Sequence, residues 1–531
     1  MWWSRLRIIT LATIFGVLLC NAQQCNGFLP AESMKNGNNP PNGGLRSLTA
    51  LSASSNQGSP LMKDLSVVIA GAGPSGLFLA HHLLQQGANV SIHDCRPDPR
   101  STDEDSVSSG RAYALGLGIR GRTALQDYDP KLWEAIHQRG KDCDRFRLHI
   151  GPLKLKIRDS VKGQTPTLLI FQSELCSALL DSLEECFGNS NHLELQFQSC
   201  VTSCDLTKRQ ITVQTATNET QIEPYDLLVG CDGVHSVVRN ALEQAVSPPF
   251  SSQKYPLPGS FKTVRIDHMP PPLDPNSVAA MVAIKQKTLA VVVPGSEKGP
   301  KQASILFISN AKSESDSNLI LDFDDNIVND SNNSTLPKIL LQTFPLLEGI
   351  DLNKVADQLV GQKARQGSSI VCNAYHYRDS VALVGDAAKA CAGGVGQGQG
   401  ANTALQDASV LTECLVNCFR NMESTTTSTL LQSALNQYSK QRVPEGKALY
   451  DLSFGPKPKG LKKKLGYIGK GIRDTVFKGR YGIGKKPLRE RLTTTMEPIS
   501  NIRRQLDRFY EEPFPDDASF DKSIDSLYSD H

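Results

Sequence analysis

The sequence predicts an α/β protein in which a Rossmann-like dinucleotide-binding domain contains an inserted mixed or antiparallel sheet and is followed by a helical C-terminal region. Three observations support this fold. A glycine-rich turn joins an apolar strand to a helix near residue 70, and two more apolar strands end in Asp-Gly and Gly-Asp near residues 231 and 385. Residues 251–308 alternate apolar and polar side chains, as half-buried strands do. The 531 residues are enough for about two or three domains of ordinary size.

The first strand, turn and helix come from residues 65–87. The apolar run LSVVIA is rich in β-branched side chains, which is typical of a buried parallel strand. The turn that follows contains Gly71, Gly73, Pro74, Ser75 and Gly76. Gly71 permits the tight turn, Gly73 lets the backbone approach a pyrophosphate, and Gly76 lets the helix pack closely on the strand. The N-terminus of the helix then offers free N–H groups to phosphate.

A second strand, residues 89–93, ends on Asp94. This acid lies where such units place a carboxylate that accepts a hydrogen bond from a ribose hydroxyl. A glycine-rich turn alone is weak evidence for a ligand. Because strand, turn, helix and acid occur here in the expected order, the sequence predicts a dinucleotide site.

Charge and cysteine usage indicate neither nucleic acid nor metal. The formal net charge of +3 argues neither for nor against a nucleic-acid partner, and we expect none. The 13 cysteines include no CxxC pair, and no histidine lies at zinc-ligand spacing, so we expect no metal site. We interpret the cysteines as reduced core thiols. Disulfides are the alternative if the mature protein is secreted, and glycosylation sequons at Asn218 and Asn332 keep that alternative open.

Residues 1–63 have the composition of a leader. Arg5 and Arg7 precede the apolar run 8–19, which is typical of a secretory signal peptide and short for a membrane span. Residues 28–63 are rich in Asn, Ser, Gly and Pro, as in a transit peptide. Together they resemble the bipartite leader that directs proteins to complex plastids of algae. We therefore expect a plastid location, with the secretory pathway or an endomembrane as the alternative.

Three further stretches indicate which dinucleotide is bound. Residues 110–122 carry Arg111, which could reach a pyrophosphate, and Gly116. Residues 225–239 read as a buried strand, an Asp232-Gly233 turn and a helix that begins near Ser236. The coincidence of strand, turn and helix features makes this second stretch a strong signal.

The third stretch begins with a strand at residues 381–384 and ends in the helix after residue 402. Asp386 is placed to bind a ribityl hydroxyl, and the backbone from Gly398 to Asn402 can approach the edge of an isoalloxazine ring. The N-terminus of the following helix would stabilise negative charge on a reduced flavin. A flavin nucleotide is therefore the dinucleotide that this stretch favours.

Together these stretches resemble the class A flavoprotein monooxygenases, the aromatic hydroxylases, from about residue 65 to residue 452. Within that family the chain is most similar to the kynurenine 3-monooxygenases, in residues 110–125, 225–239, 251–266, 371–388 and 438–454. The resemblance implies FAD as cofactor, NADPH or NADH as co-substrate, and insertion of one oxygen atom from O2 into an aromatic or conjugated small molecule. It also implies a Rossmann-like domain of the para-hydroxybenzoate hydroxylase type.

Carried over residue by residue, the resemblance assigns cofactor binding to a set of turn and loop residues. They are Gly71, Gly73, Pro74, Ser75, Gly76, Asp94, Arg96, Arg111, Gly116, Gln172, Asp232, Gly233, Asp386, Gly398, Gly400, Ala401 and Asn402. Gln172 stands where the family often has arginine, and Arg239 would help Asp232 hold a turn that serves both FAD and NADPH. Arg147 partly matches a family arginine and would anchor a substrate carboxylate. We assign no catalytic acid or nucleophile, because the cofactor carries the chemistry.

The chain departs from the family after Asp386. Lys389 replaces the usual histidine, the proline that follows is absent, and the glycine loop is slightly longer. Lys389 could pair with anionic reduced flavin or phosphate, or lie on the surface. These departures leave two alternatives open: an epoxidase or hydroxylase of a membrane isoprenoid or quinone, and an FAD-binding protein that lacks hydroxylase activity.

We predict five segments along the chain. They are a leader (1–63), an FAD-binding domain (64–150, 168–245 and 371–453), a substrate domain (151–167 and 246–370), a basic helical region (454–510) and a disordered tail (511–531). The basic region could lie on an anionic membrane surface or pack as a cap on the substrate domain.

Overall fold

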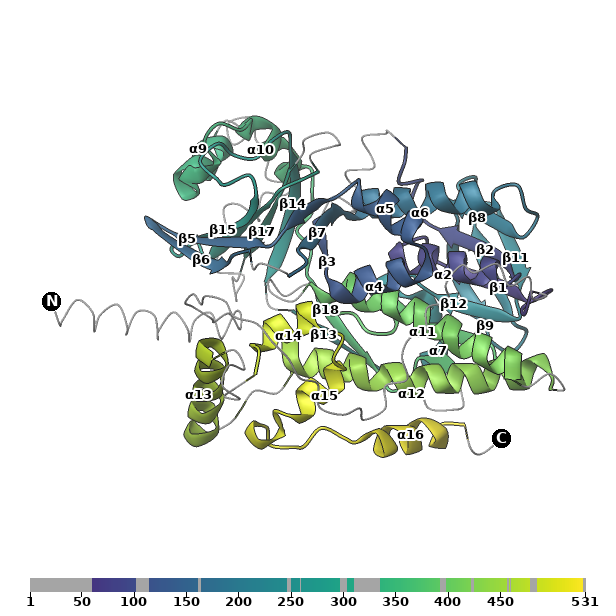
Figure 1. The fold of residues 1–531 in the computed structure, drawn as a ribbon. Coiled ribbons are helices and arrows are strands. Elements are labelled where there is room, and N and C mark those ends of the chain that lie inside the picture. Colours follow the sequence, from purple (N-terminus) through teal and green to yellow (C-terminus); the bar gives the residue numbers. More distant parts are fainter. Residues whose placement is uncertain are drawn as a thin grey trace.

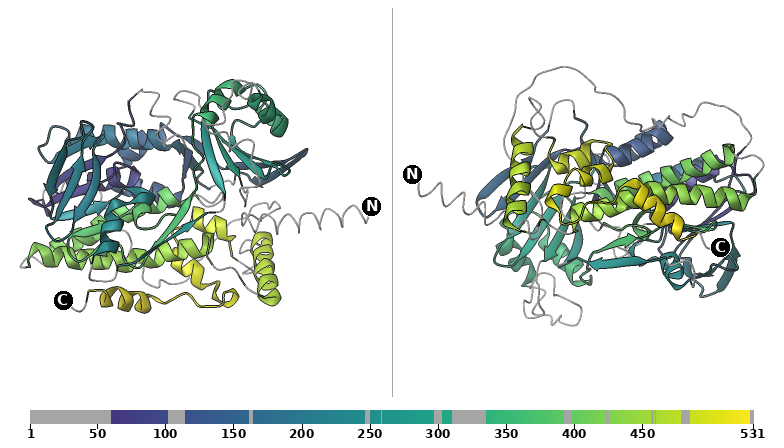
Figure 2. Two further views of the ribbon diagram at one scale, coloured as in Figure 1. Left: turned by 180° about the vertical axis from the view of Figure 1, so that it is seen from behind. Right: turned by 90° about the horizontal axis from the view of Figure 1, so that it is seen from below.

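The computed structural model describes residues 60–528 except 102–113, 161–163, 246–249, 258, 297–302, 310–334, 392–397, 422–424, 456–457, 459 and 478–484. Two six-stranded sheets dominate it, one on each side of the molecule in Figure 1. Long helices pack along the first sheet, and the C-terminal helices run beneath them (Figures 1 and 2).

The first sheet is the predicted Rossmann-like sheet. Its strand order is β19 (His376–Tyr377), β20 (Val381–Leu383), β12 (Leu227–Gly230), β1 (Ser66–Ala70), β2 (Asn89–Asp94) and β8 (Leu193–Phe197). All pairings are parallel except β19 with β20. The carboxyl ends of β1, β2, β12 and β20 therefore meet at one edge, where ligands bind in such sheets.

Helices and smaller sheets surround this sheet. The helices include α2 (Pro74–Gln85), α4 (Ile119–Tyr128), α5 (Pro130–His137), α6 (Gln172–Phe187), α7 (Val237–Gln244), α11 (Gln399–Asn421) and α12 (Thr427–Ser453). A three-stranded sheet orders β3 (Ala114–Leu117), β7 (Thr167–Phe171) and β4 (Lys141–Cys143), and another orders β11 (Thr220–Pro224), β10 (Gln210–Gln214) and β9 (Cys200–Asp205). A pair joins β13 (Ser252–Pro256) to β18 (Ser368–Cys372).

The second sheet has the order β14 (Ser260–Ile266), β17 (Ala303–Ser309), β16 (Thr288–Val293), β15 (Ser277–Ala283), β5 (Arg145–Ile150) and β6 (Leu153–Arg158). It is mixed, because β5 runs parallel to β15 while its other pairs are antiparallel. Helices α9 (Leu336–Thr343) and α10 (Leu352–Val360) share a hydrophobic core with one face. Since β5 belongs here, the domain boundary predicted at residue 150 is wrong and lies before β5.

The C-terminal region is helical, as expected. It comprises α13 (Leu461–Phe477), α14 (Leu488–Thr494), α15 (Ile499–Arg504) and α16 (Asp517–Ser526). The prediction of a disordered tail is wrong, because α16 packs along α12, where Asp525 pairs with Lys440 at 2.7 Å and Ile524 is buried. The charged tail still carries apolar residues at helical spacing, which provide that contact.

The interpretation of all cysteines as reduced thiols is also wrong. Cys95, directly after Asp94, forms a disulfide with Cys200 at the start of β9. The adjacent backbone is already held together, since Ser199 N donates to Asp94 O at 2.9 Å. Folding brings these cysteines into contact across 105 residues of sequence.

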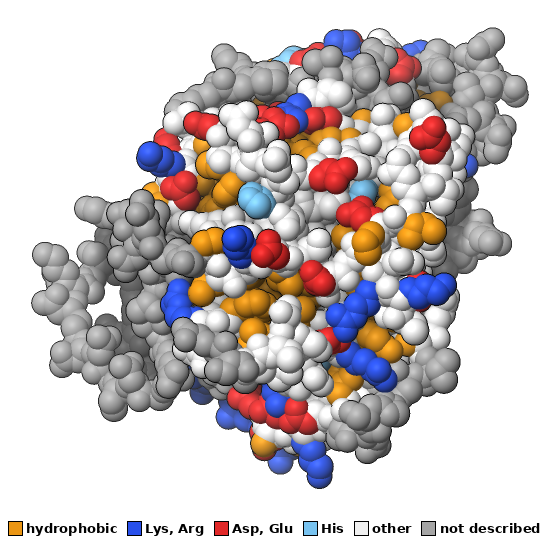
Figure 3. Space-filling model, turned by 90° about the vertical axis from the view of Figure 1, so that its right-hand side faces the viewer, with side chains coloured by type: hydrophobic (Ala, Val, Ile, Leu, Met, Phe, Trp, Pro, Cys, Tyr) orange, Lys and Arg blue, Asp and Glu red, His pale blue; other side chains and the backbone are white. Residues whose placement is uncertain are grey.

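Two surface features bear on possible partners. The face in Figure 3 mixes acidic, basic and apolar side chains without an extended area of one charge sign. None of the helices within the described ranges is long and apolar enough to cross a membrane.

Candidate active site

The glycine turn after β1 has the geometry that its sequence predicts. Gly71 has a φ of +105°, and a Cβ there would lie 2.5 Å from Cys231 O. A Cβ on Gly76 would lie 2.0 Å from Gly71 O, so only glycine lets α2 approach the turn. A Cβ on Gly73 would meet nothing within 4 Å. The space beside Gly73, at the N-terminus of α2, is thus open for a phosphate group.

Asp94 closes one side of this turn. Its Oδ2 accepts from Ala72 N at 2.8 Å, and its carboxylate receives two hydrogen bonds from the Arg96 guanidinium, at 2.9 and 2.7 Å. The side chain is buried, whereas Arg96 is partly exposed. Asp94 and Arg96 therefore lie together beside the glycine turn.

The Asp-Gly and Gly-Asp turns lie side by side and are tied together by Arg239. Its guanidinium donates to Val234 O at 2.7 Å, after the first turn, and to Ala387 O at 3.0 Å, in the second. Asp232 Oδ2 accepts from Val237 N at 2.7 Å and caps α7. Its other oxygen is sealed from solvent without a protein partner. Gly233 follows with a φ of +77°.

Asp386 follows Gly385 shortly after β20, and its side chain is exposed. The protein around it nevertheless raises the pKa of the carboxyl group to about 6. A Cβ on Gly400 would lie 3.9 Å from Asp386 Oδ1, so α11 begins directly beside this carboxylate. Ser75 lies against Gly385, since a Cβ there would be 3.1 Å from Ser75 Oγ. The structure thus brings the first and third motifs together around one space.

Asn402 binds four backbone groups from three segments. Its Oδ1 accepts from Gly118 N at 2.8 Å and Gly121 N at 3.2 Å. Its Nδ2 donates to Gly116 O at 2.8 Å and to Gly398 O at 2.6 Å. The sequence predicted a backbone role for Asn402, whereas the structure shows that its buried side chain holds β3, α4 and the glycine loop in position.

The remaining residues of the cofactor prediction lie on α2, α6 and α11 or outside the described residues. Gln172 begins α6 directly after β7, and Ala401 lies in the first turn of α11. Pro74 and Ser75 form the first turn of α2. Arg111 lies outside the described residues.

Lys389 does not lie on the exterior, so the interpretation as a surface lysine is wrong. It is buried and pairs with Asp407 on α11, whose other oxygen accepts from Arg442 Nε on α12 at 2.6 Å. Burial lowers the pKa of Lys389 to about 8, which Asp407 partly opposes. Asp407 Oδ2 also accepts a hydrogen bond from Gly385 N at 3.4 Å. The cluster of Lys389, Asp407 and Arg442 therefore supports the Gly-Asp turn.

Sequence inspection missed Asp407 and Arg442. Both lie among residues that the motifs include, Asp407 in the helix after the glycine loop and Arg442 in residues 438–454. Charged residues are rarely buried unless they are paired, but the local sequence does not show that these two are buried.

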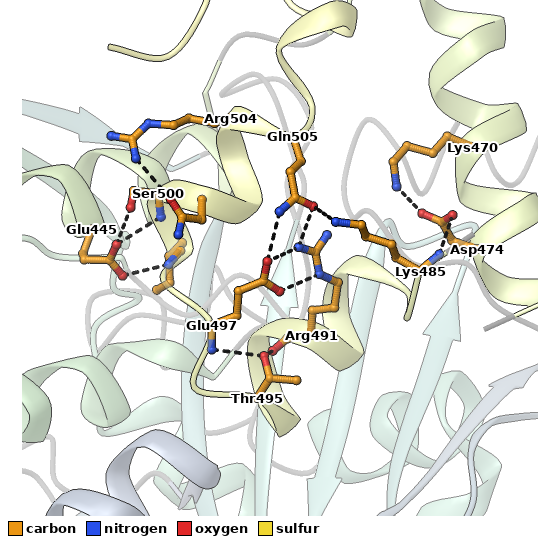
Figure 4. Close-up of polar contacts among 12 residues, drawn as sticks. Glu445, Lys470, Asp474, Lys485, Arg491, Thr495, Glu497, Ser500, Arg504 and Gln505 are labelled. Carbon is orange, nitrogen blue, oxygen red and sulfur yellow. Dashed lines mark hydrogen bonds and ion pairs between the residues drawn. The ribbon is translucent and has the colours of Figure 1, made fainter. Parts of the chain in front are cut away.

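The C-terminal segment closes one side of the site. A Cβ on Gly118 would lie 3.3 Å from Thr493 O, and Arg120 donates to Glu497 O. Figure 4 shows how this segment is fixed: Arg491 binds the Glu497 carboxylate at 2.6 and 3.0 Å. In the same figure Glu445 on α12 accepts from Ser500 Oγ at 2.7 Å.

The second sheet has one face that α9 and α10 do not cover. The register places three rows of side chains there, and nearly all are apolar. The rows are Phe146, Val278, Val293, Ser304 and Arg265; Leu148, Ala280, Val291, Leu306 and Thr263; and Ile150, Val282, Leu289, Ile308 and Phe261. Most are half-buried, and none belongs to a described hydrophobic core.

Arg147 lies on the other face. It is paired with Ala279, which packs in the core beneath α9 and α10. Its guanidinium donates to Asp159 at 2.6 Å and to Arg158 O at 2.7 Å. Arg147 is therefore already neutralised and faces away from the apolar rows, which argues against its predicted role as a carboxylate anchor.

Comparisons with known proteins agree with this geometry. A family model described as an FAD binding domain matches residues 64–453. Kynurenine 3-monooxygenase of Anopheles gambiae is 26% identical over 433 residues, covering 80% of this chain and 78% of that protein. Kynurenine 3-monooxygenase of Salinispora tropica is 27% identical, covering 73% of this chain and 78% of that protein.

Solved structures show the same fold. The tetrameric form of 2-methyl-3-hydroxypyridine-5-carboxylic acid oxygenase has a TM-score of 0.54 at 19% identity, covering 73% of this chain and 89% of that one. PqsL of Pseudomonas aeruginosa in complex with 2-aminobenzoylacetate has a TM-score of 0.51 at 18% identity, covering 73% and 94%. With the family match over most of the described residues, the chain belongs to the FAD-binding family of class A flavoprotein monooxygenases.

Proposed function

We propose that this flavoprotein uses NADPH, or alternatively NADH, and O2 to hydroxylate an aromatic or conjugated small molecule. The observation that carries the proposal is that the open Gly73 turn, the accessible Asp386 carboxylate and the start of α11 lie together at the carboxyl ends of the first sheet's strands. The named relatives act on kynurenine, an aromatic compound, and the apolar rows of the second sheet suit a ligand of that character.

The residues present fit FAD. The open N-terminus of α2 would receive the pyrophosphate, and Asp94 lies where a ribose would bind. The accessible Asp386 carboxylate offers an acceptor to a hydroxyl group of the cofactor. FAD, when bound, supplies the redox and oxygen chemistry. The protein holds the backbone of Gly398–Asn402 in place through Asn402 and closes the site with residues 493–497.

A hollow beside the Asp-Gly turn is our candidate for the nicotinamide co-substrate. It has a volume of about 320 Å³ and is lined by Val234, His235, Arg239, Asn240, Glu243, Ser252 and Lys254. Lys254 offers positive charge to phosphate groups. Since Arg239 also touches the Gly-Asp turn, this hollow lies next to the proposed flavin site.

The test is NADPH oxidation in air by the yellow holoenzyme, with kynurenine, hydroxybenzoates, quinones and xanthophylls as candidates. We expect one compound to speed oxidation and to gain one oxygen atom from labelled O2. The Gly73→Ala variant is the matched control, because it has room for the added methyl group but would obstruct the pyrophosphate. FAD binding without any oxygenated product would favour the alternative of a flavoprotein that does not hydroxylate.

A second candidate substrate is a membrane-borne isoprenoid or quinone, and α13 favours it. Leu461, Leu465 and Ile468 are 75%, 59% and 51% exposed and form one apolar stripe beside exposed lysines. The opposite side of the helix packs on the body through Tyr467, whose ring lies 5.5 Å from that of Phe509. A helix held in this way would present its apolar stripe to an anionic membrane surface.

Vesicle flotation tests this contact. We expect the holoenzyme to bind phosphatidylserine-containing vesicles and Leu465→Glu to weaken binding. Ile222→Glu, at an equally exposed apolar site on β11, is the control. Equal flotation of all three proteins would contradict the proposal.

We also propose delivery to a plastid by residues 1–63, on the sequence features described above. These residues lie almost entirely outside the part of the chain that the structure describes. Fusing residues 1–63 to a fluorescent protein in an alga with complex plastids tests the proposal. Secretion or retention in an endomembrane would contradict it.

A further inference from the structure

A disulfide lies directly beside the cofactor site. Cys95 follows Asp94 at the end of β2 and precedes Arg96. It is bonded to Cys200, the first residue of β9. The disulfide is therefore part of the short loop that carries two of the residues assigned to the cofactor.

This Asp94 loop, residues 94–96, is a tight structure in which Cys95 cannot move alone. Arg96 N donates to Asp94 Oδ1 at 2.8 Å, and the Arg96 guanidinium binds the same carboxylate. Asp94 Oδ2 accepts from Ala72 N in the glycine turn at 2.8 Å. One carboxylate thus connects the backbone after Cys95 to the turn that precedes α2. A displacement of Cys95 would shift this carboxylate and the fit of the turn to FAD.

The partner segment, residues 198–200, joins two different sheets. It leads from β8 of the first sheet to β9 of a separate three-stranded sheet. Gln198 has a φ of +52°, a left-handed conformation that residues other than glycine adopt only at a cost. Two backbone hydrogen bonds hold the segment to the Asp94 loop, from Ser199 N to Asp94 O at 2.9 Å and from Gln198 N to Arg96 O at 3.1 Å. The disulfide adds a covalent bond to this contact and fixes a strained connection against the loop.

The disulfide is open to solvent, unlike most cysteines in the described part of the chain. Cys95 is exposed, and Cys200 is partly exposed. By contrast, the buried free cysteines are Cys143, Cys176, Cys231, Cys372, Cys414 and Cys418. A reductant can therefore approach Cys95 without opening the core. Exposed disulfides are also the ones that exchange readily with thiols.

We propose that the Cys95–Cys200 disulfide is a redox switch that controls FAD affinity, and that its partner is a dithiol protein of the CxxC class. The inference rests on the proposed function, because it adds regulation to the same cofactor site. The oxidised form clamps residues 198–200 on the Asp94 loop and holds FAD tightly. Reduction leaves hydrogen bonds alone to oppose relaxation of Gln198, so the loop loosens and FAD affinity falls.

The reaction is a thiol–disulfide exchange. A thiolate of the partner attacks the Cys95 sulfur, the S–S bond breaks, and Cys200 leaves as a thiolate that takes up a proton. The second thiol of the partner then attacks the mixed disulfide and releases Cys95 as a thiol. The chain gains two electrons and two protons, and the partner becomes a disulfide. The flavin takes no part in this exchange.

The test measures the Kd of FAD in the oxidised and the reduced holoenzyme. The holoenzyme is treated anaerobically with reduced thioredoxin or with dithiothreitol, and the fluorescence of FAD released on dilution gives the Kd. Labelling with N-ethylmaleimide, read by mass spectrometry, reports the state of Cys95 and Cys200. We expect both to be unlabelled at first and labelled after reduction. The Kd should then rise by about 3- to 10-fold, the equivalent of about one hydrogen bond, and reoxidation should restore it.

Three variants accompany this measurement. Cys95→Ser and Cys200→Ser cannot form the disulfide, so each should have the raised Kd from the start and should not respond to thioredoxin. Cys186→Ser removes an exposed free thiol on α6 and should respond as the wild type does. If a serine variant does not fold, the cycle of reduction and reoxidation of the wild type decides the question, since it changes no residue.

Three results would overturn the proposal. They are labelling of both cysteines in the untreated holoenzyme, resistance of the disulfide to thioredoxin until urea unfolds the protein, and a Kd of FAD that stays within twofold after complete reduction. Failure of the proposed function looks different. In that case NADPH oxidation yields no oxygenated product in either redox form, although the Kd of FAD still follows the state of the disulfide.

Discussion

Replacing Asp407 with asparagine tests whether the buried charge cluster supports the flavin-facing turn. Asp407 is fully buried, and its carboxylate contacts both Lys389 and Arg442. Asparagine keeps the shape of the side chain but removes its charge, so both cations remain buried without their shared acid. Removing one partner of a buried ion pair costs about 3–5 kcal/mol.

This loss converts into a measurable shift in thermal stability. An unfolding entropy of about 2.1 cal/mol/K per residue gives about 0.8 kcal/mol/K for a cooperative unit of roughly 400 residues. The Tm of Asp407→Asn should therefore fall by about 4–6 °C. Release of flavin fluorescence on heating reports it, and FAD affinity should weaken as well, because Gly385 N loses an acceptor.

Two further variants make the result decisive. Asp181→Asn removes an acid that is 46% exposed and pairs with Arg139, so its Tm should change by less than about 1 °C. Adding Lys389→Met to Asp407→Asn removes one of the two stranded cations and should recover part of the loss. The reasoning is refuted if Asp407→Asn has the same Tm as the wild type, or if the double variant has a lower Tm than Asp407→Asn alone.

Three other predictions concern the cofactor site. Gly73→Ala should fold but lose FAD. Gly76→Ala should damage the fold, because its methyl group would lie 2.0 Å from Gly71 O. Soluble yield and flavin content distinguish the two variants. Asn402→Ala should weaken FAD binding strongly, since it leaves four backbone groups without partners at about 1–3 kcal/mol each; an unchanged FAD Kd would contradict this. Because desolvation by the surrounding protein raises the pKa of the accessible Asp386 carboxyl group from 3.8 to about 6, FAD affinity should fall below about pH 6, where the carboxylate becomes protonated. This dependence should vanish in Asp386→Asn. The same pKa shift changes the stability of the apoprotein in the opposite direction to FAD affinity. The contribution of Asp386 to the free energy of unfolding is largest below about pH 4 and is lost as pH rises through 6, which urea unfolding checks.

The cofactor-binding half of the fold was predictable from local patterns. Buried parallel strands leave continuous apolar runs, and the turns after them require glycine where the backbone is tight or the helix is close. Gly71 and Gly76 show both requirements in the structure. Since parallel strands end at one edge of a sheet, the order of the motifs was enough to bring Asp94, Asp232 and Asp386 to the same edge.

Side-chain partners were decided only by tertiary packing. Lys389 could be read as a surface or flavin-binding residue because nothing local shows that α11 and α12 bring Asp407 and Arg442 behind it. The disulfide and the helical tail depend in the same way on distant segments, Cys200 for Cys95 and α12 for α16. Local sequence does not encode these contacts. They form between helices and strands that are distant in the sequence, and the packing of the whole core determines how these elements lie against each other.

Arg147 and Arg265 on the second sheet show the same difference between what local sequence indicates and what tertiary packing decides. Alternation in the sequence indicates that neighbouring side chains of a strand point to opposite faces, but not which face is covered by helices. The parallel pairing of β5 with β15 places Arg147 on the covered face, and the pairing of β14 with β17 places Arg265 on the other. The sequence therefore determined the strands and their alternation. Only the packing of α9 and α10 decided which arginine lies on the uncovered face, since coverage of a face depends on elements far along the chain.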